Sequence, residues 1–317
     1  MEITLPTPPS VEKMQFDNYR EPSAPTSYSS ETDTTVRQPK PPRRSLIPWL
    51  LLLLLIAGAV LVAYEMHTAN YSAKPISDYA KTLTYQLKSG PSNNIVYPQA
   101  GPFDERHGYS RLPQLLPRLL DRNFRIMAQT EFSPALQSYA EQGFFPPYRE
   151  KVQSGLFLAD CRNETLFDFN YPQRVYRDPR DIPLVVAHSL LFIENRNLLR
   201  IPAMANPVMD WPRFIMAAAS QVGKVLSVGG QSAGGSTLAT QIEKFRHSPQ
   251  GLTRSFKDKA VQIISGTIRV YSHGPNTMGM RTRIVQDYLN TVPLSSAPGH
   301  GEVHGVGDAL YAWFGSD

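Results

Sequence analysis

The chain has 317 residues, of which 41% are hydrophobic and 19% charged, and its formal net charge is +5. This length allows one or two domains with a sizeable core, and the small basic excess is compatible with anionic partners without identifying one. Cys161 is the only cysteine, which excludes an internal disulfide and a cysteine-based zinc site.

The N-terminal part of the sequence predicts a tail followed by a membrane anchor. Residues 1–45 are rich in Pro, Ser, Thr and charge, so they cannot bury a core and are expected to be a disordered tail. Residues 46–64 (LIPWLLLLLLIAGAVLVAY) carry no charge and are about long enough to cross a bilayer as one helix. Lys40, Arg43 and Arg44 precede this helix, and the positive-inside rule then puts the tail in the cytoplasm. We therefore expect a single-pass protein of the cytoplasmic (inner) membrane with a periplasmic or extracellular C-terminal domain.

Residues 65–174 have the mixed pattern of an extracytoplasmic stem or a small α+β domain. Their predicted elements are a strand over 94–97, an amphipathic helix over 112–126, a helix over 133–144 with Ser133 as N-cap, and a hairpin formed by GLFLADC and TLFDFNY. The pattern gives a fold expectation for this segment but no role.

Residues 175–317 have a helical pattern, so this domain is predicted to be mainly α. Helices are expected within DPRDIPLVVAHSLLFIENRNLL, WPRFIMAAASQVGKVL, GGSTLATQIEKF, TRSFKDKAVQIISGTIRVYS, MRTRIVQDYLNTV and GVGDALYAWFG. The first is expected to open at Asp181 and Pro183, and the fourth to bury a stripe that includes Ile263, Ile264 and Ile268. The last helix reaches Asp317 with nothing to pack beside it, so we expect this domain to be incomplete at its C-terminus.

The stretch GGSTLATQIEKF places polar groups on one helix face. Thr237, Thr240, Gln241 and Lys244 follow the i, i+3, i+4, i+7 spacing of a single face, just behind a glycine turn. A helix that starts at glycines offers free N–H groups and a positive dipole end, which favour an anion. The alternative is an ordinary amphipathic surface helix.

Two further features point to the same chemistry. Glu194 follows an apolar run, which would partly withdraw its carboxylate from water, as suits a general base; the alternative is a solvated glutamate. Cations are dense over residues 244–259, namely Lys244, Arg246, His247, Arg254, Lys257 and Lys259. They are typical either of a clamp on a diphosphate or lipid headgroup, or of a solvated charge run. Aromatic residues are only sparsely interleaved with these cations, and the segment is expected outside the cytoplasm, so no nucleic acid is expected. The scattered histidines predict no metal site.

These stretches resemble the peptidoglycan glycosyltransferase (transglycosylase) domain of glycosyltransferase family 51, as found in class A penicillin-binding proteins. GGSTLATQIEK resembles that family's G-G-S-T-I-T-Q-Q-x-x-K motif, RIVQDYLNTVPL its I-L-x-x-Y-L-N motif and HGVGDALYAWFG its closing motif. DIPLVVAHSLLFIEN is similar to the approach to the E-D-x-x-F motif and puts Glu194 at the catalytic glutamate.

The resemblance implies a lysozyme-like helical fold and polymerisation of lipid II at the outer face of the cytoplasmic membrane. Glu194 would then be the general base, and the residues implied to hold sugar and diphosphate are Ser236, Thr237, Gln241, Lys244, Lys257 and Asn290. The implied partners are lipid II, nascent glycan strands, the membrane and cell-envelope proteins. No cofactor is implied, and a divalent cation is compatible with the chemistry.

The sequence also departs from the family pattern. Asn195, Leu198 and Ile201 replace an aspartate, an aromatic and a histidine of the first motif. The third motif, R-K-x-x-E, aligned on FKDKAVQI, keeps Lys257 but puts Ala260 at its glutamate, with Asp258 or Gln262 as candidate substitutes. These departures leave two alternatives open. One is a catalytically weak relative that binds lipid II or glycan as an envelope scaffold. The other is a lysozyme-like glycan cleaver, against which the G-S-T-x-x-x-Q-x-x-K pattern argues.

Overall fold

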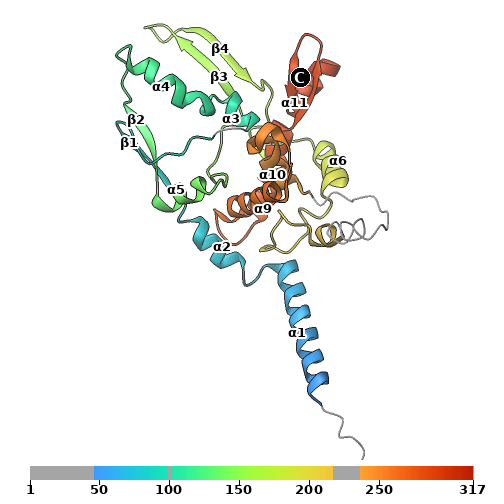
Figure 1. Cartoon of the computed structure of the whole chain (residues 1–317). Coiled ribbons are helices and arrows are strands. Elements are labelled where there is room, and N and C mark those ends of the chain that lie inside the picture. The colour runs from blue at the N-terminus through green and yellow to red at the C-terminus, as the bar shows by residue number, and fades with distance from the viewer. Residues whose placement is uncertain (1–45, 99–100, 217–235, 317) are drawn as a thin grey trace, which may run out of the picture. The chain divides into compact units, whose positions relative to one another are not determined.

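The computed structural model describes residues 46–98, 101–216 and 236–316 (Figure 1). By its contacts the chain divides into two units, residues 1–49 and residues 50–317, and the contacts discussed below lie within the second. The helices and 3-10 turns (η) are α1 Ile47–Thr68, α2 Ala73–Ala80, α3 Pro102–Arg106, η1 Tyr109–Arg111, α4 Leu112–Leu120, α5 Pro134–Glu141, η2 Pro179–Asp181, α6 Leu184–Glu194, α8 Leu238–His247, η3 Pro249–Gly251, α9 Phe256–Tyr271, α10 Met278–Thr291 and α11 Val306–Phe314. The strands are β1 Tyr85–Ser89, β2 Ala128–Phe132, β3 Ser154–Ala159, β4 Thr165–Tyr171, β5 Pro293–Ala297 and β6 Gly301–His304. Helices therefore predominate, as the sequence predicts.

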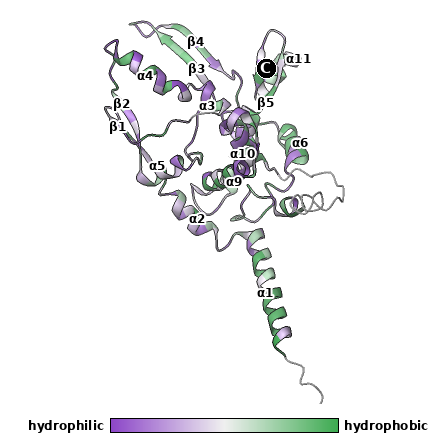
Figure 2. Cartoon of the chain, in the orientation of Figure 1, coloured by the Kyte–Doolittle hydropathy of each residue, from purple (hydrophilic) through white to green (hydrophobic). Residues whose placement is uncertain are grey.

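Helix α1 is the predicted apolar helix, and it is continuous over 22 residues. None of its residues is buried against the protein, and the colouring in Figure 2 marks most of its length as hydrophobic. At 1.5 Å per residue it is about 33 Å long, which matches the hydrocarbon core of a bilayer. By length and composition α1 can cross a membrane. Its orientation stays a prediction.

The described residues form three two-stranded antiparallel sheets, β1–β2, β3–β4 and β5–β6. The predicted hairpin is confirmed as β3–β4, and Ser133 caps α5 by accepting a hydrogen bond from the N–H of Leu136 at 3.2 Å. The predicted strand over 94–97 is wrong, because Ile95 and Val96 are partly buried against the small core around Leu136 instead of pairing. The pairing of β1 with β2 was not predicted, since it joins segments about 40 residues apart in sequence.

Helices α8, α9 and α10 surround the main core of the C-terminal part. The buried apolar side chains that these helices contribute to it are Leu238, Ala239, Ile242, Phe245, Val270, Ile284, Val285 and Leu289. The stripe predicted on α9 is only partly correct: Ile268 is buried, whereas Ile264 is 41% exposed. The buried face of α9 uses small groups instead, because a Cβ on Gly266 would lie 3.3 Å from Val208. Glycine at this position lets α9 approach its neighbour closely.

Helix α6 differs from its predicted start. Asp181 belongs to the short turn η2, Pro183 is the N-cap, and the helix begins at Leu184. It ends at Glu194, because Asn195 leaves the helical region with φ −155°. The helix predicted from residue 211 onward and the glycines at 234–235 lie largely or wholly outside the described residues.

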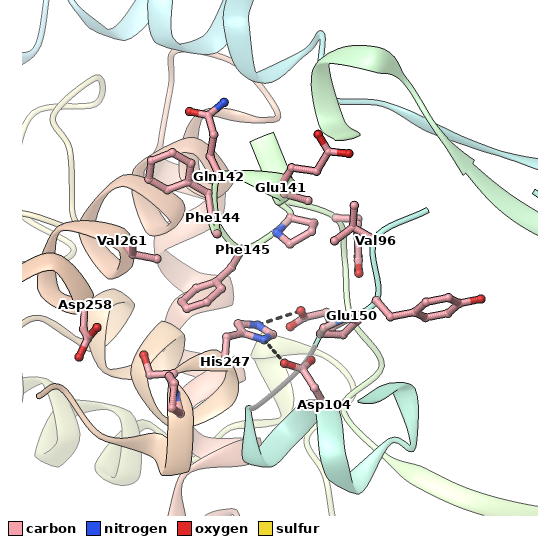
Figure 3. Close-up of a pocket in the computed structure, with 18 of the residues that line it drawn as sticks. Val96, Asp104, Glu141, Gln142, Phe144, Phe145, Glu150, His247, Asp258 and Val261 are labelled. Atoms are coloured by element: carbon pink, nitrogen blue, oxygen red, sulfur yellow. Dashed lines mark hydrogen bonds and ion pairs between the residues drawn. The ribbon is translucent and has the colours of Figure 1, made fainter. Parts of the chain in front are cut away.

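Buried charges join the segment before residue 154 to the C-terminal helices. His247 on α8 lies between Asp104 on α3 and Glu150, as the dashed lines in Figure 3 show. Its Nδ1 bonds to the Asp104 carboxylate at 3.1 Å, and its Nε2 forms an ion pair with the Glu150 carboxylate at 2.9 Å. Glu150 also contacts Arg246 at 3.3 Å and Arg269 at 3.8 Å. We call these five residues the ion cluster.

Candidate functional site

The structure brings Glu194, Gln241 and Tyr288 together from three helices. Nε2 of Gln241 donates a 2.7 Å hydrogen bond to Oε2 of Glu194, and the hydroxyl of Tyr288 donates at 3.3 Å to Oε1 of Gln241. Glu194 is half-buried at the C-terminal end of α6. Burial raises the pKa of Tyr288, and the charge of Glu194 raises it further, so this phenol stays neutral and donates. The chain of bonds fixes the orientation of one partly exposed carboxylate.

A lysine not selected as a site residue from the sequence lies near the start of α8. Nζ of Lys259 donates to Oγ of Ser236 at 2.9 Å and lies 3.4 Å from Oγ1 of Thr240. Burial lowers the pKa of Lys259, and the neighbouring charge of Lys244 lowers it further. These two ammonium groups repel each other, and a bound anion would reduce that repulsion.

Lys257 lies elsewhere. It is exposed and lines a different pocket, beside Asp258, Val261 and His247. Two helical positions differ by about 200° around the axis, so Lys257 and Lys259 cannot share one face of α9. Lys259, and not Lys257, is thus the lysine near Ser236, and a role of either lysine in substrate binding stays a prediction.

Thr237 and Asn290 are used by the fold. Thr237 is 2% exposed, and its hydroxyl donates to the carbonyl of Val208 at 2.9 Å and caps α8. Asn290 is also 2% exposed, and its amide bonds twice to the backbone of Tyr176, both at 2.8 Å. Both side chains therefore already serve structural hydrogen bonds, and their contact with substrate stays a prediction.

The third-motif position carries no carboxylate here. Counted from Lys259, the K-x-x-E spacing falls on Gln262, which is fully buried and bonded to Ser248 at 2.9 Å and Thr253 at 2.8 Å. Asp258, the other candidate substitute, caps α9 by accepting from the N–H groups of Arg254 and Ser255. Both candidates are committed to structural bonds, so Glu194 is the carboxylate that the described site offers.

Arg281 holds the segment that follows Glu194. Its guanidinium is 1% exposed and donates to the carbonyls of residues 201, 202, 203 and 205 and to the hydroxyl of Thr277. This segment continues to Val208, whose carbonyl anchors Thr237 at the start of α8. Arg281 thereby links α10 to the segment that runs from Glu194 to Val208, and through Val208 to the start of α8. A lone arginine in a helix gives no sequence signal for such a role.

A mainly helical domain thus presents one oriented carboxylate on α6 and two neighbouring lysines on α8 and α9, groups that can take a proton and bind an anion. Residues 162–317 match the family model described as Transglycosylase. This part of the chain belongs to that family and is a peptidoglycan glycosyltransferase domain of family 51. No curated protein matches the chain significantly.

Proposed function

We propose that the protein polymerises lipid II at the outer face of the cytoplasmic membrane, with Glu194 as general base. The acceptor's sugar 4-hydroxyl would attack the anomeric carbon of the lipid-linked donor, Glu194 would take the hydroxyl proton, and the lipid diphosphate would leave with inversion. The observation that carries this proposal is the 2.7 Å bond from Gln241, which orients the carboxylate beside the lysine-bearing face of α8. In this proposal α1 anchors the domain where its lipid substrate lies, with the N-terminal tail in the cytoplasm.

The lysines explain how one carboxylate would be enough. A diphosphate leaves as an anion, so it requires positive charge more than a proton donor. Lys244 and Lys259 would supply that charge, while Ser236 and Gln241 would donate hydrogen bonds to phosphate or sugar oxygens. With this division of roles, Gln262 in place of a second glutamate does not prevent the reaction.

A second candidate function is a scaffold that binds lipid II or glycan without polymerising it. Gln262 at the third-motif position, buried and already bonded, favours this alternative. Full-length protein in detergent micelles, given fluorescent lipid II, separates the two. Glycan chains on a gel support the transferase, whereas lipid II binding without chains supports the scaffold.

The two lysines of α9 give a matched test. Lys259→Met should weaken binding of the lipid diphosphate about 10- to 100-fold, as expected for loss of a charge-assisted contact. Lys257→Met, two residues away on the same helix, should change the dissociation constant less than about twofold. Lipid II binding to full-length protein by fluorescence anisotropy gives both values. Equal effects of the two variants would contradict the assignment.

A further inference from the structure

A basic pocket of about 550 Å³ lies apart from Glu194. It is formed by segments 147–157 and 175–177 together with parts of α8, α9 and α10. Its charged lining residues are Arg149, Lys151, Arg177, Arg246, Arg269 and Arg283, against Glu150 and Asp287. Glu194, Gln241, Lys244 and Lys259 are not among the residues that line it.

The charges in this pocket separate into a neutralised interior and an uncompensated rim. Arg246 and Arg269 are buried and pair with Glu150, Glu243 and Asp287. The remaining four cations are exposed or at the edge and form no ion pair with any residue that the structure describes: Arg149, Lys151, Arg177 and Arg283. The acids are therefore already used, and the rim keeps its positive charge for another partner.

The charge of one rim arginine also acts on a neighbouring histidine. Burial lowers the pKa of His273, and the positive charge of Arg283 lowers it further. His273 consequently stays neutral near pH 7 and leaves the rim arginines as the charged groups. Between them lie Tyr148, Leu156 and Phe157, which give the pocket apolar as well as cationic contacts.

The spread of the four cations limits the type of ligand. They come from three separate segments of chain around a volume of small-ligand size, so a ligand with several anionic groups suits them better than a single phosphate. Guanidinium groups pair well with carboxylates, and the apolar side chains between them suit an organic backbone. An acidic peptide combines these properties.

We propose that this pocket binds the carboxylate-bearing peptide portion of the glycan strand, away from the site of transfer. This inference rests on the proposed function, because a peptidoglycan glycosyltransferase handles a glycan that carries peptides. Held in this pocket, a peptide would keep its strand on the enzyme between additions.

Binding of soluble fragments tests the inference. Full-length Glu194→Gln protein in nanodiscs, which is expected not to turn over, would be titrated with three probes: a disaccharide–peptide with free carboxylates, the same fragment with its carboxylates amidated, and the peptide-free disaccharide. The first should bind about tenfold or more tightly than the others, with an affinity that falls as salt is raised. Equal binding of the free and amidated fragments would overturn the proposal.

A double variant locates the contact. Arg177→Gln with Arg283→Gln should reduce binding of the free-carboxylate fragment at least about tenfold. Arg180→Gln is the matched control, because Arg180 is 89% exposed, pairs with Asp178 and does not line the pocket. Unchanged binding by the double variant, or competition by inorganic phosphate at the fragment's own concentration, would also overturn the proposal.

Fragment binding without lipid II polymerisation by wild-type protein would refute the proposed function alone. Polymerisation without selective fragment binding would refute this inference alone.

Discussion

Glu194→Gln is expected to abolish lipid II polymerisation while leaving the melting temperature close to that of wild-type protein. The substitution keeps the size of the side chain, and its amide oxygen can still accept the bond from Gln241. What is lost is the group that takes the proton of the attacking hydroxyl. Loss of a general base typically lowers a rate about 10²- to 10⁴-fold. Chain yield from fluorescent lipid II, measured beside thermal unfolding, gives both results.

The control for this prediction is Glu141→Gln, an exposed glutamate on α5 that bonds only to Gln137 among described side chains. This variant should polymerise as wild-type protein does. A Glu194→Gln protein that makes chains at more than about a tenth of the wild-type rate would remove Glu194 from the role of base. Lipid II affinity should be nearly unchanged in both variants, since neither loses a cation. Wild-type protein that binds lipid II but makes no chains would favour the scaffold.

The sequence singled out candidate site residues but could not show how all of them are arranged. Glu194 and Gln241 were selected from motif positions, and the structure joins them across 47 residues. Lys257 was selected by the motif alignment, which does not show which way a side chain on α9 faces. Thr237 was selected through the family resemblance, which does not show that its hydroxyl caps its own helix.

Long-range contacts were beyond the sequence for a different reason. The pairing of β1 with β2 depends on partners distant in the chain, and each strand has only five residues, most of them not buried. Arg281 bonds to backbone carbonyls, which every residue carries, so no pattern in residue type marks its partners. Local signals such as the Ser133 cap and the β3–β4 hairpin were recovered because their determinants lie within a few residues.

Glu150→Gln is expected to cause the largest loss of stability among the substitutions considered. The Glu150 carboxylate contacts His247, Arg246 and Arg269, and its side chain is 7% exposed. Removing one partner of a buried charge pair typically costs about 3–5 kcal/mol, because the remaining charges stay buried without compensation. For a protein of this size, that should lower the melting temperature by roughly 10 °C. Glu131→Gln, which breaks the exposed pair with Lys88, should change it little.

The ion cluster should also make stability depend on pH on both sides of a narrow optimum. Burial would lower the pKa of His247, but the carboxylates of Glu150 and Asp104 outweigh burial and raise it to about 9, from an ordinary value of 6.5. Because the folded state holds this proton more tightly, the stabilisation is complete below about pH 6.5 and is lost as pH rises through 9. Burial would raise the pKa of Glu150, but His247, Arg269 and Arg246 hold it well below its ordinary value of 4.5, so its contribution is lost in acid.

Melting temperatures of the full-length protein across pH test this expectation. Wild-type protein should be most stable between about pH 5 and 6.5 and should lose stability from pH 6.5 to 9. His247→Gln should start less stable and show a much flatter profile over that interval, because no histidine proton remains to be lost. A wild-type profile that is flat from pH 6.5 to 9 would mean that His247 is not held protonated.

The ion cluster fixes the C-terminal end of α8, and this helix also carries Gln241 and Lys244. Wild-type protein should therefore bind lipid II more weakly as the pH rises from 6.5 to 9.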